Sequence, residues 1–368
     1  MLGPSALGGL LAGVRFDPFK AQDDPLPFIV SPHRETLRDG TERFSLGVLD
    51  LRSRSTSEIE TGFMGHSVLA DPSRPGRVVY LAQRPGRLAC ELDLEDGIVH
   101  RVFESGEGRH FYGHGAYSPD GRYLFSTENE IDTGKGIVVV RDGRDYKVLE
   151  ELPSHGIGPH ELKVLAGDGL AVICNGGSQT TADRPDFDVD AMRPTLTYVD
   201  LANGKRIRED ALPIPRLSVR HLALTPQDDV AVGLKLYGPQ DRWAPCLAFR
   251  TAGGPLKLAR GPKRLMKKMG NSGFSLAIHE SSKTLGVTHP DGGHVTFWDL
   301  RTHRFLKAMA VAQPEGITTT QDDERFVITS RSGTLEAVTC ATLEPDPEFL
   351  ASVRGLNWRH ASNGLFNR

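Results

Sequence analysis

The sequence predicts an all-β fold, a seven-bladed β-propeller. Three observations predict it. A strand–turn–strand phrase recurs along the chain, its recurrences are 41 to 61 residues apart, and glycine and proline occur 40 and 24 times. Repeats of about 40–50 residues with four short strands each are typical of propeller blades, including those of WD40-like and YVTN-like proteins. Glycine and proline supply the tight turns that many short strands require.

Each repeat opens with a short apolar strand, passes through a turn rich in Pro, Asp, Gly and Ser, and enters a β-branched strand. In chain order the phrases are HSVLADPSRPG from His66, HGAYSPDGRYLF from His114, HELKVLAGDG from His160, HLALTPQDD from His221, SLAIHESSKT from Ser275 and GITTTQDDER from Gly316. The segments GRLACELDLEDG, GIVVVRDGRDYKVLE, TLTYVDLANGKRI and HVTFWDLRTHRF fit the outer hairpins of four blades, which turn at an Asp-x-x-x-Gly-like motif.

A seventh repeat is divided between the two ends of the chain. Residues 27–51 supply its outer strands, and LNWRHASNGLF at the C-terminus supplies an innermost strand near His360, 44 residues after Gly316. Pairing these segments in one blade closes the ring and removes open sheet edges. We therefore predict one propeller over residues 27–368, preceded by a tail of residues 1–26.

Composition excludes several classes of protein. The net charge is −3, from 44 basic and 47 acidic residues, which argues against a nucleic-acid-binding protein. No apolar run reaches the length of about 18 residues that a membrane-spanning helix needs, so we predict no membrane span. We also predict that the protein is a monomer. Four scattered cysteines form no CxxC motif and are either buried thiols or up to two disulfides: Cys90, Cys174, Cys246 and Cys340.

The first residues, MLGPSALGGLLAG, are small and apolar. They resemble the second half of a signal peptide whose basic start is missing. The alternative is a disordered tail.

Histidine begins five of the seven predicted innermost strands. The positions are His66, His114, His160, His221, Ser275, Gly316 and His360. Equivalent positions of successive blades meet around one axis, so these side chains are expected to converge. A single histidine at a strand start is most often structural. Five converging imidazoles would repel one another when protonated, and a metal or an anionic ligand would resolve that conflict.

We predict that His66, His114, His160, His221 and His360 bind a transition metal, because neutral imidazole is the commonest metal ligand in proteins. Metal-ligating histidines normally donate their second N–H to a carboxylate or carbonyl group. Residues near the ring that could orient the ligands or contact a bound molecule are Arg109, His110, Glu128, Glu161, Asn175, Arg220 and Glu315. Each of them alone has a solvated or structural role as the alternative.

The absence of Cys and Met from the ring disfavours copper(I), whereas imidazole with one or two carboxylates suits iron, copper(II) or zinc. Binding should weaken below about pH 6, where imidazole takes up a proton. The occupant is either a bare metal ion or a small metal chelate.

Several longer motifs together resemble a bacterial family of unknown function: GRHFYGHGAYSPDGRYLFSTEN, GIGPHEL, CNGG, DAMRPTLTYVDLANG, SVRHLAL, GGHVTFWDL and NWRHASN. Members of that family look like exported propellers, typically with a twin-arginine signal. They commonly occur beside imelysin-like iron-uptake proteins and dihaem-peroxidase-like proteins. The resemblance implies a periplasmic location, iron as the metal, less readily copper, and such proteins as partners. It implies no established enzymatic activity. The chain lacks the twin-arginine start, and Ser275 offers no imidazole.

Two other functions remain open. A metal with an open coordination position could support a redox or hydrolytic enzyme, although the sequence contains no GxSxG, HExxH, Walker or GxGxxG motif and no catalytic residue is predicted. A protein-interaction scaffold without metal would explain the fold but not the repeated histidines.

Overall fold

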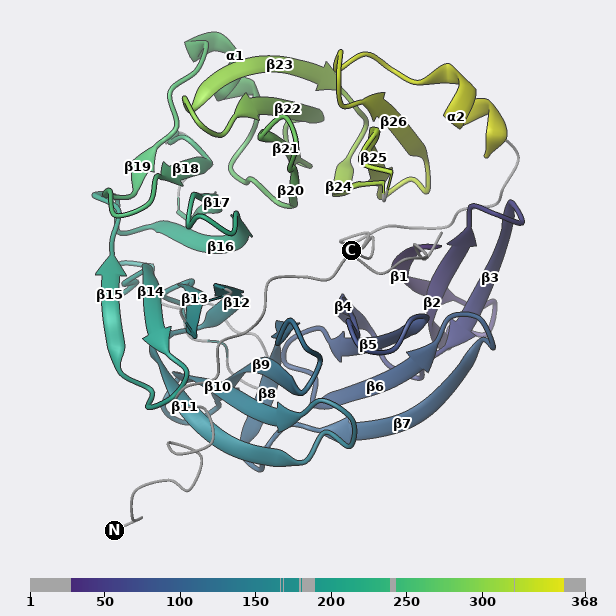
Figure 1. Cartoon of the computed structure of the whole chain (residues 1–368), viewed down its shortest axis with the longest axis vertical. Coiled ribbons are helices and arrows are strands. Elements are labelled where there is room, and N and C mark those ends of the chain that lie inside the picture. The colour runs from purple at the N-terminus through teal and green to yellow at the C-terminus, as the bar shows by residue number, and fades with distance from the viewer. Residues whose placement is uncertain are drawn as a thin grey trace.

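The structure is a computed structural model. It describes residues 28–353 except positions 166, 168, 179, 181–188, 239–242 and 321. Within these residues the strands form seven antiparallel sheets arranged as the blades of a propeller, so the predicted all-β, seven-bladed fold is confirmed (Figure 1). We number the blades in chain order.

Each blade is a meander of consecutive strands. Blade 1 contains β1 (Phe28–Thr36), β2 (Glu42–Asp50) and β3 (Ser55–Glu60); blade 2 contains β4 (Gly65–Ala70), β5 (Arg77–Ala82), β6 (Leu88–Asp93) and β7 (Ile98–Glu104); blade 3 contains β8 (Arg109–Tyr117), β9 (Tyr123–Glu130), β10 (Lys135–Asp142) and β11 (Val148–Ile157); blade 4 contains β12 (Pro159–Leu165), β13 (Leu170–Asn175), β14 (Thr195–Asp200) and β15 (Arg206–Asp210).

The remaining blades follow the same order. Blade 5 contains β16 (Leu217–Leu224), β17 (Val230–Leu236), β18 (Leu247–Arg250) and β19 (Lys257–Leu258); blade 6 contains β20 (Leu276–His279), β21 (Thr284–His289), β22 (His294–Asp299) and β23 (Arg304–Ala310); blade 7 contains β24 (Pro314–Thr319), β25 (Arg325–Ser330) and β26 (Leu335–Thr339). Two short helices, α1 (Lys263–Lys268) and α2 (Pro347–Ser352), lie at the rim (Figure 1).

The first strands of blades 2 to 7 lie innermost. Those of blades 2 to 6 each contact the first strand of the next blade, and together the six strands surround the centre of the ring (Figure 1). We call this region the hub. The predicted innermost strands at His66, His114, His160, His221 and Gly316 lie in β4, β8, β12, β16 and β24, and Ser275 immediately precedes β20.

The outer hairpins turn at an aspartate, as their sequences predict. In blade 2 the Asp93 carboxylate accepts hydrogen bonds from the backbone N–H groups of Glu95 and Asp96, at 2.8 and 2.9 Å. Gly97 then takes a left-handed conformation with φ of 68°. The same aspartate-centred turn recurs at Asp142, Asp200 and Asp299. Aspartate at this position stabilises the turn because its side chain replaces a backbone acceptor.

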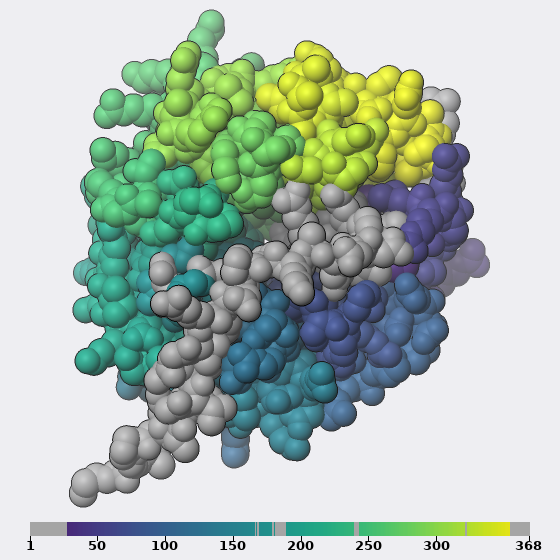
Figure 2. Space-filling model, in the orientation of Figure 1, coloured from purple at the N-terminus to yellow at the C-terminus, as the bar shows by residue number. Residues whose placement is uncertain are grey.

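Seven apolar clusters fill the interfaces between neighbouring blades. One of them packs Ile29 and Leu49 of blade 1 with Val327 and Ala337 of blade 7, so the first and last blades are in contact. The space-filling view shows the blades side by side in chain order around the disc (Figure 2). Burial on both faces of each sheet explains why the central strands are rich in Val, Ile and Leu.

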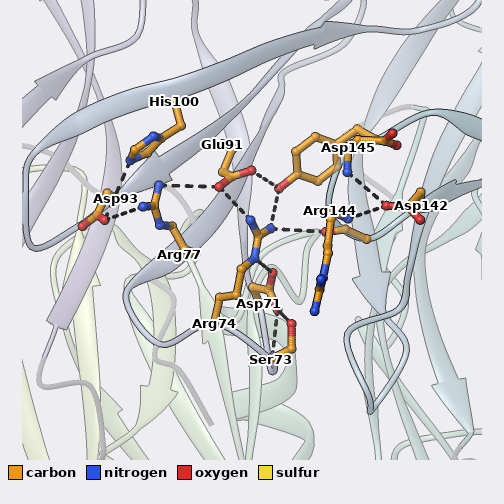
Figure 3. A network of polar contacts seen from close by, with 12 residues as sticks. Asp71, Ser73, Arg74, Arg77, Glu91, Asp93, His100, Asp142, Arg144 and Asp145 are labelled. Atoms are coloured by element: carbon orange, nitrogen blue, oxygen red, sulfur yellow. Dashed lines mark hydrogen bonds and ion pairs between the residues drawn. The ribbon is translucent and has the colours of Figure 1, made fainter.

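A polar network reinforces the interface between blades 2 and 3 (Figure 3). Arg74 pairs with Asp71 and Glu91 at 2.6 and 3.0 Å and donates to the carbonyl of Gly143 in blade 3 at 3.3 Å. The hydroxyl of Tyr146, also in blade 3, donates to Glu91 at 2.6 Å. The linked charges are mutually satisfied, which a buried polar joint requires.

Two further predictions concern the strand that closes the ring and the state of the four cysteines. The predicted closing strand near His360 lies outside the described residues. The cysteines Cys90, Cys174, Cys246 and Cys340 are all free and buried, so buried thiols are the correct alternative. Neither helix of the described residues is long and apolar enough to cross a membrane.

Candidate metal centre

Irregular pairing places the hub histidines. In β4 the register with β5 shifts between Gly65 and Ser67, so His66 occupies a bulge. In β12 it shifts between Pro159 and Glu161, which places His160 in the same position. A β-bulge redirects a side chain and is common beside functional sites. The register shift therefore turns the side chains of His66 and His160 towards the hub.

The corresponding irregularity in blade 3 lies between Phe111 and Gly115 and contains His114. Gly113 is required next to it. Its φ is 105°, and an added Cβ would lie 2.6 Å from Cδ2 of His66. The carbonyl of Gly113 also accepts a hydrogen bond from the Ser67 hydroxyl at 2.6 Å, which ties blade 3 to blade 2 at this point.

Four imidazoles form one cluster. Ring centroids of His66 and His114 are 4.6 Å apart, those of His114 and His160 are 5.0 Å apart, and those of His160 and His221 are 4.8 Å apart. Across the cluster, His66 and His221 are separated by 6.5 Å. The structure thus brings together the four predicted ligands that lie in its described part. The fifth, His360, lies outside it.

Two groups of these side chains are close enough to hold a metal ion. The ligand atoms of His66, His114 and His160 all lie within 4.8 Å of one another, and so do those of His114, Glu161 and His221. His114 belongs to both groups. All five side chains are buried.

The cluster contains imidazole nitrogens without hydrogen-bond partners among the described residues. They are both nitrogens of His66, Nε2 of His114, Nδ1 of His160 and Nε2 of His221. Leaving a buried polar atom unpaired costs about 1–3 kcal/mol. Four adjacent side chains that pay this cost at one point indicate that another group completes their bonding.

Burial keeps these imidazoles neutral. Desolvation lowers the pKa of His114 to about 3 and lowers the pKa values of His66, His160 and His221 as well. The Arg220 guanidinium acts in the same direction on all four. A neutral imidazole keeps a nitrogen lone pair, so the cluster is in the state that a metal requires.

Glu161 is the carboxylate of the cluster. Its Oε2 lies 3.3 Å from Nδ1 of His221 and accepts the backbone N–H of Leu222, while its Oε1 lies 3.2 Å from Nζ of Lys163. Burial alone would raise the pKa of Glu161, but Lys163 and the adjacent histidines outweigh it and hold that pKa well below its ordinary value. The carboxylate is therefore ionised and can orient His221.

Arg220 lies on the other side of His160. Its Nη2 is 3.3 Å from Nε2 of His160, and its Nη1 donates to the Tyr237 hydroxyl at 2.7 Å. Because a guanidinium can only donate, Nε2 of His160 is the acceptor in this contact, and Nδ1 of the neutral ring carries the proton. Of the predicted orienting residues, Glu161 and Arg220 thus contact the histidine cluster directly.

The other predicted neighbours have partners elsewhere. His110 stacks on Tyr112 with a centroid separation of 5.7 Å, and Tyr112 in turn contacts the edge of His160. Arg109 pairs with Glu151 at 2.7 Å, and Glu128 pairs with Arg141 at 2.6 Å.

Two further predicted residues are also structural in their contacts. Asn175 donates to the carbonyl of Ser154 at 3.0 Å and to the hydroxyl of Thr197 at 2.9 Å. Glu315 pairs with Arg331, and burial raises its pKa.

The register also corrects which positions are equivalent. The bulge residue in blade 5 is Arg220, with His221 one position later, and in blade 7 it is Glu315 instead of Gly316. The equivalent of His221 in blade 4 is Glu161, which explains why these two side chains meet. A one-residue slip in pairing exchanges the residue that a strand presents to a given face.

Several contributors to the site were not predicted from the sequence: Arg84, Tyr112, Lys163, Lys235 and Tyr237. Arg84 lies over the Tyr112 ring at 4.7 Å, and Lys235 lies 5.3 Å from the centroid of Tyr237. Tyr112 stands inside the quoted motif GRHFYGHG, which was the available signal. Lys163 lies within β12, whereas Arg84, Lys235 and Tyr237 lie at or beyond the ends of second strands.

A family model described as "Protein of unknown function (DUF1513)" matches residues 60–358. The chain belongs to this family. The match confirms the resemblance to a family of unknown function, and it covers all four clustered histidines as well as Glu161 and Arg220.

Similarity to curated proteins is partial. The chain is 30% identical over 171 residues to a protein described as methionyl-tRNA formyltransferase from Anaeromyxobacter dehalogenans strain 2CP-C, covering 43% of this chain and 49% of that protein. A protein of the same description from strain 2CP-1 is 30% identical over 119 residues, covering 31% and 36%. The chain spans about half the length, or less, of the curated relatives it matches.

Solved structures share the fold. Hydrazine synthase of Kuenenia stuttgartiensis superposes with a TM-score of 0.64 and 14% identity, covering 88% of this chain and 99% of that chain. U3-55K superposes with a TM-score of 0.55 and 13% identity, covering 77% and 79%. At such identities the likeness shows the propeller architecture alone.

Proposed function

We propose that this DUF1513 protein binds a transition-metal ion at its hub, with His66, His114, His160 and His221 as imidazole ligands and Glu161 as the nearby carboxylate. The observation that carries the proposal is the set of buried imidazole nitrogens without partners. A metal can bond to the one lone pair that each neutral ring carries, and the depressed pKa values keep the rings neutral at pH 7.

The donor set favours particular metals. Imidazole and carboxylate suit iron(II), zinc and copper(II), and neither candidate group among the described residues includes a thiolate. We propose iron as the natural ion and the periplasm as the location. The support for both is the motif resemblance to exported propellers that occur beside imelysin-like iron-uptake proteins.

The surrounding side chains would hold the ligands in position. Glu161 accepts from His221 Nδ1 and so directs Nε2 of the same ring into the cluster. Arg220 can only donate, so at His160 it occupies the lone pair of Nε2 and leaves the proton on Nδ1, and metal binding by His160 would require that contact to be released. A carboxylate contact of the kind that Glu161 makes fixes ring orientation and raises ligand basicity in known metal sites. Because three to four imidazoles are positioned in advance, little ordering accompanies binding, which suits a protein that retains or delivers a metal.

Elemental analysis tests the proposal. Tag-free protein would be exposed separately to iron, copper and zinc, freed of excess metal, and measured by plasma mass spectrometry. We expect near-stoichiometric metal in the wild type and a loss of at least about 10³-fold in affinity in His114→Ala, because His114 belongs to both ligand groups.

The matched control is His289→Gln, which changes a buried histidine of blade 6 outside the cluster. It should retain the metal. Absence of metal from the wild type under every condition, or normal loading of His114→Ala, would refute a metal site at the hub.

A further inference from the structure

Cationic side chains lie at the hub beside the histidine cluster. Arg84, Lys163 and Arg220 lower the pKa values of its imidazoles, and Lys235 lies against Tyr237, where Arg84 and Arg220 act on it. Of these, Lys163 is neutralised by Glu161 at 3.2 Å. The remaining three gather on the side of the cluster where His160 and Tyr237 lie.

The contacts define this basic wall, a term we use for Arg84, Arg220 and Lys235. Arg220 bridges His160 and Tyr237. Arg84 hydrogen-bonds the Tyr237 hydroxyl and covers the ring of Tyr112. Lys235 packs against the ring of Tyr237. Three cations therefore surround one phenol next to the unpaired imidazoles.

Two members of the wall have no carboxylate beside them among the described residues. Within the part of the chain that the structure describes, neither Arg84 nor Lys235 forms an ion pair with a carboxylate. The charge of Asp291 acts to raise the pKa of Lys235. The Asp291 carboxylate itself accepts a hydrogen bond from the Ser272 hydroxyl. Like charges held together in a half-buried region repel, and burial together with Arg220 and Arg84 lowers the pKa of Lys235.

A metal ion would increase this repulsion. Arg220 touches the same histidine that the metal would use, so a cation at the cluster and the guanidinium would be separated by one imidazole. In a region of low dielectric, such a pair is unfavourable unless a negative charge lies between them. An oxyanion supplies that charge, and arginine guanidinium groups bind carboxylate and phosphate oxygens with matching geometry.

Resting on the proposed metal function, we propose that the hub binds a small oxyanion, a carboxylate or phosphate group, on Arg84, Arg220 and Lys235 beside the histidine cluster. The anion neutralises the basic wall and offers an oxygen to the metal. It is either a free anion that binds with the ion or a carboxylate arm of a chelate that carries the ion in.

Titration calorimetry on the full-length, metal-free protein tests this. Ferrous iron would be titrated under anaerobic conditions in oxyanion-free buffer, then with inorganic phosphate, then with citrate. Phosphate and citrate would also be titrated without iron. We expect the oxyanion to raise the apparent iron affinity at least about 10-fold, since ligands that relieve each other's unfavourable charge bind cooperatively. Enhancement by phosphate identifies a free anion, whereas enhancement by citrate alone identifies a chelate.

The double variant Arg84→Gln/Lys235→Gln should lose the enhancement, measured as the ratio of iron affinities with and without anion. Its charge-matched control is Lys263→Gln/Lys267→Gln in α1, whose exposed lysines lie at the rim, and this control should keep the ratio (Figure 1). An iron affinity that ignores both anions, or a double variant that keeps the enhancement, overturns the oxyanion site.

The outcomes separate the two proposals. Binding of phosphate or citrate without any iron binding supports the oxyanion site and refutes the metal function. Iron binding that no anion changes supports the metal function and refutes the oxyanion site. Binding of neither refutes both.

Discussion

Two buried histidines on different blades, His66 and His289, show opposite bonding. His289 ends β21 in blade 6, where Nδ1 lies 3.0 Å from the Ser272 carbonyl and Nε2 lies 2.8 Å from the Thr296 hydroxyl. His66 lies in the bulge of β4, and neither of its nitrogens has a partner among the residues that the structure describes. Both are buried, and desolvation lowers the pKa of both. Burial therefore does not distinguish a structural histidine from a candidate ligand, whereas hydrogen-bond satisfaction does.

The contrast extends to the two sides of the hub. Blades 2 to 5 each present a histidine, whereas blade 6 presents Ser275 and blade 7 presents Glu315, whose charge is matched by Arg331. The oxygen of Ser275 accepts from the backbone N–H of Ile317, which joins blades 6 and 7. Equivalent or adjacent strand positions thus carry candidate ligands on one side of the ring and inter-blade bonds or ion pairs on the other.

The largest effect on stability is expected at the satisfied histidine. His289→Leu would remove the donor to the Ser272 carbonyl and the acceptor of the Thr296 hydroxyl, which would keep only the hydrogen bond from the Trp298 indole, in a buried region. We expect the free energy of unfolding to fall by about 2–4 kcal/mol, because each orphaned buried group costs about 1–3 kcal/mol. Urea unfolding of the metal-free protein would measure this. A loss below about 1 kcal/mol would remove the structural role assigned to His289.

The free energy of unfolding should also depend on pH because of His289. Burial lowers the pKa of folded His289 to about 4, against about 6.5 in the unfolded chain. The stabilisation is therefore complete above pH 6.5 and is lost as pH falls towards 4, because only the unfolded chain takes up the proton in that range. The loss reaches about 3 kcal/mol for this group. Comparing unfolding free energies of wild type and His289→Gln from pH 7 to 4 isolates it, and parallel curves would contradict the assignment.

How far the sequence predicts this molecule depends on which interaction decides each feature. The blade rhythm and the turns at Asp93 and Asp142 are local, so the repeat predicts them. The convergence of four histidines follows from the rhythm together with ring geometry. Pairing register is not local, so the exchange of Arg220 for His221 at the bulge position could not be read from the chain.

The ion-pair and hydrogen-bond partners of individual side chains could not be predicted from the sequence either. Glu128 stands near the hub histidines in its motif, but its partner is Arg141 on the neighbouring strand. Arg84 of blade 2 meets Tyr237 of blade 5 only because these two blades lie across the hub from each other. Such contacts join residues far apart in sequence through the closed ring (Figure 1), and a single sequence contains no direct signal for them.

A smaller effect, on metal affinity, should distinguish the two hub carboxylates Glu161 and Glu315. Glu161→Gln removes the charge that orients His221, and we expect metal affinity to fall about 10- to 100-fold, as is usual when a group bonded to a ligand is changed. The matched variant Glu315→Gln changes a carboxylate that is already paired with Arg331 and should alter affinity less than about twofold. Titration calorimetry with one metal would compare them, and equal losses would mean that both sides of the hub hold the ion.

The smallest expected change is an increase in the stability of the metal-free protein. His66→Leu replaces an unpaired buried imidazole with an apolar side chain, which removes a desolvation penalty without removing a hydrogen bond. We expect the metal-free variant to be more stable than wild type by about 1 kcal/mol, while the stabilisation that added metal gives to wild type is lost. Thermal unfolding with and without metal would show both effects. If His66→Leu instead destabilises the metal-free protein as His289→Leu does, then His66 is a structural histidine. In that case, hydrogen-bond satisfaction does not distinguish a candidate ligand such as His66 from a structural histidine such as His289.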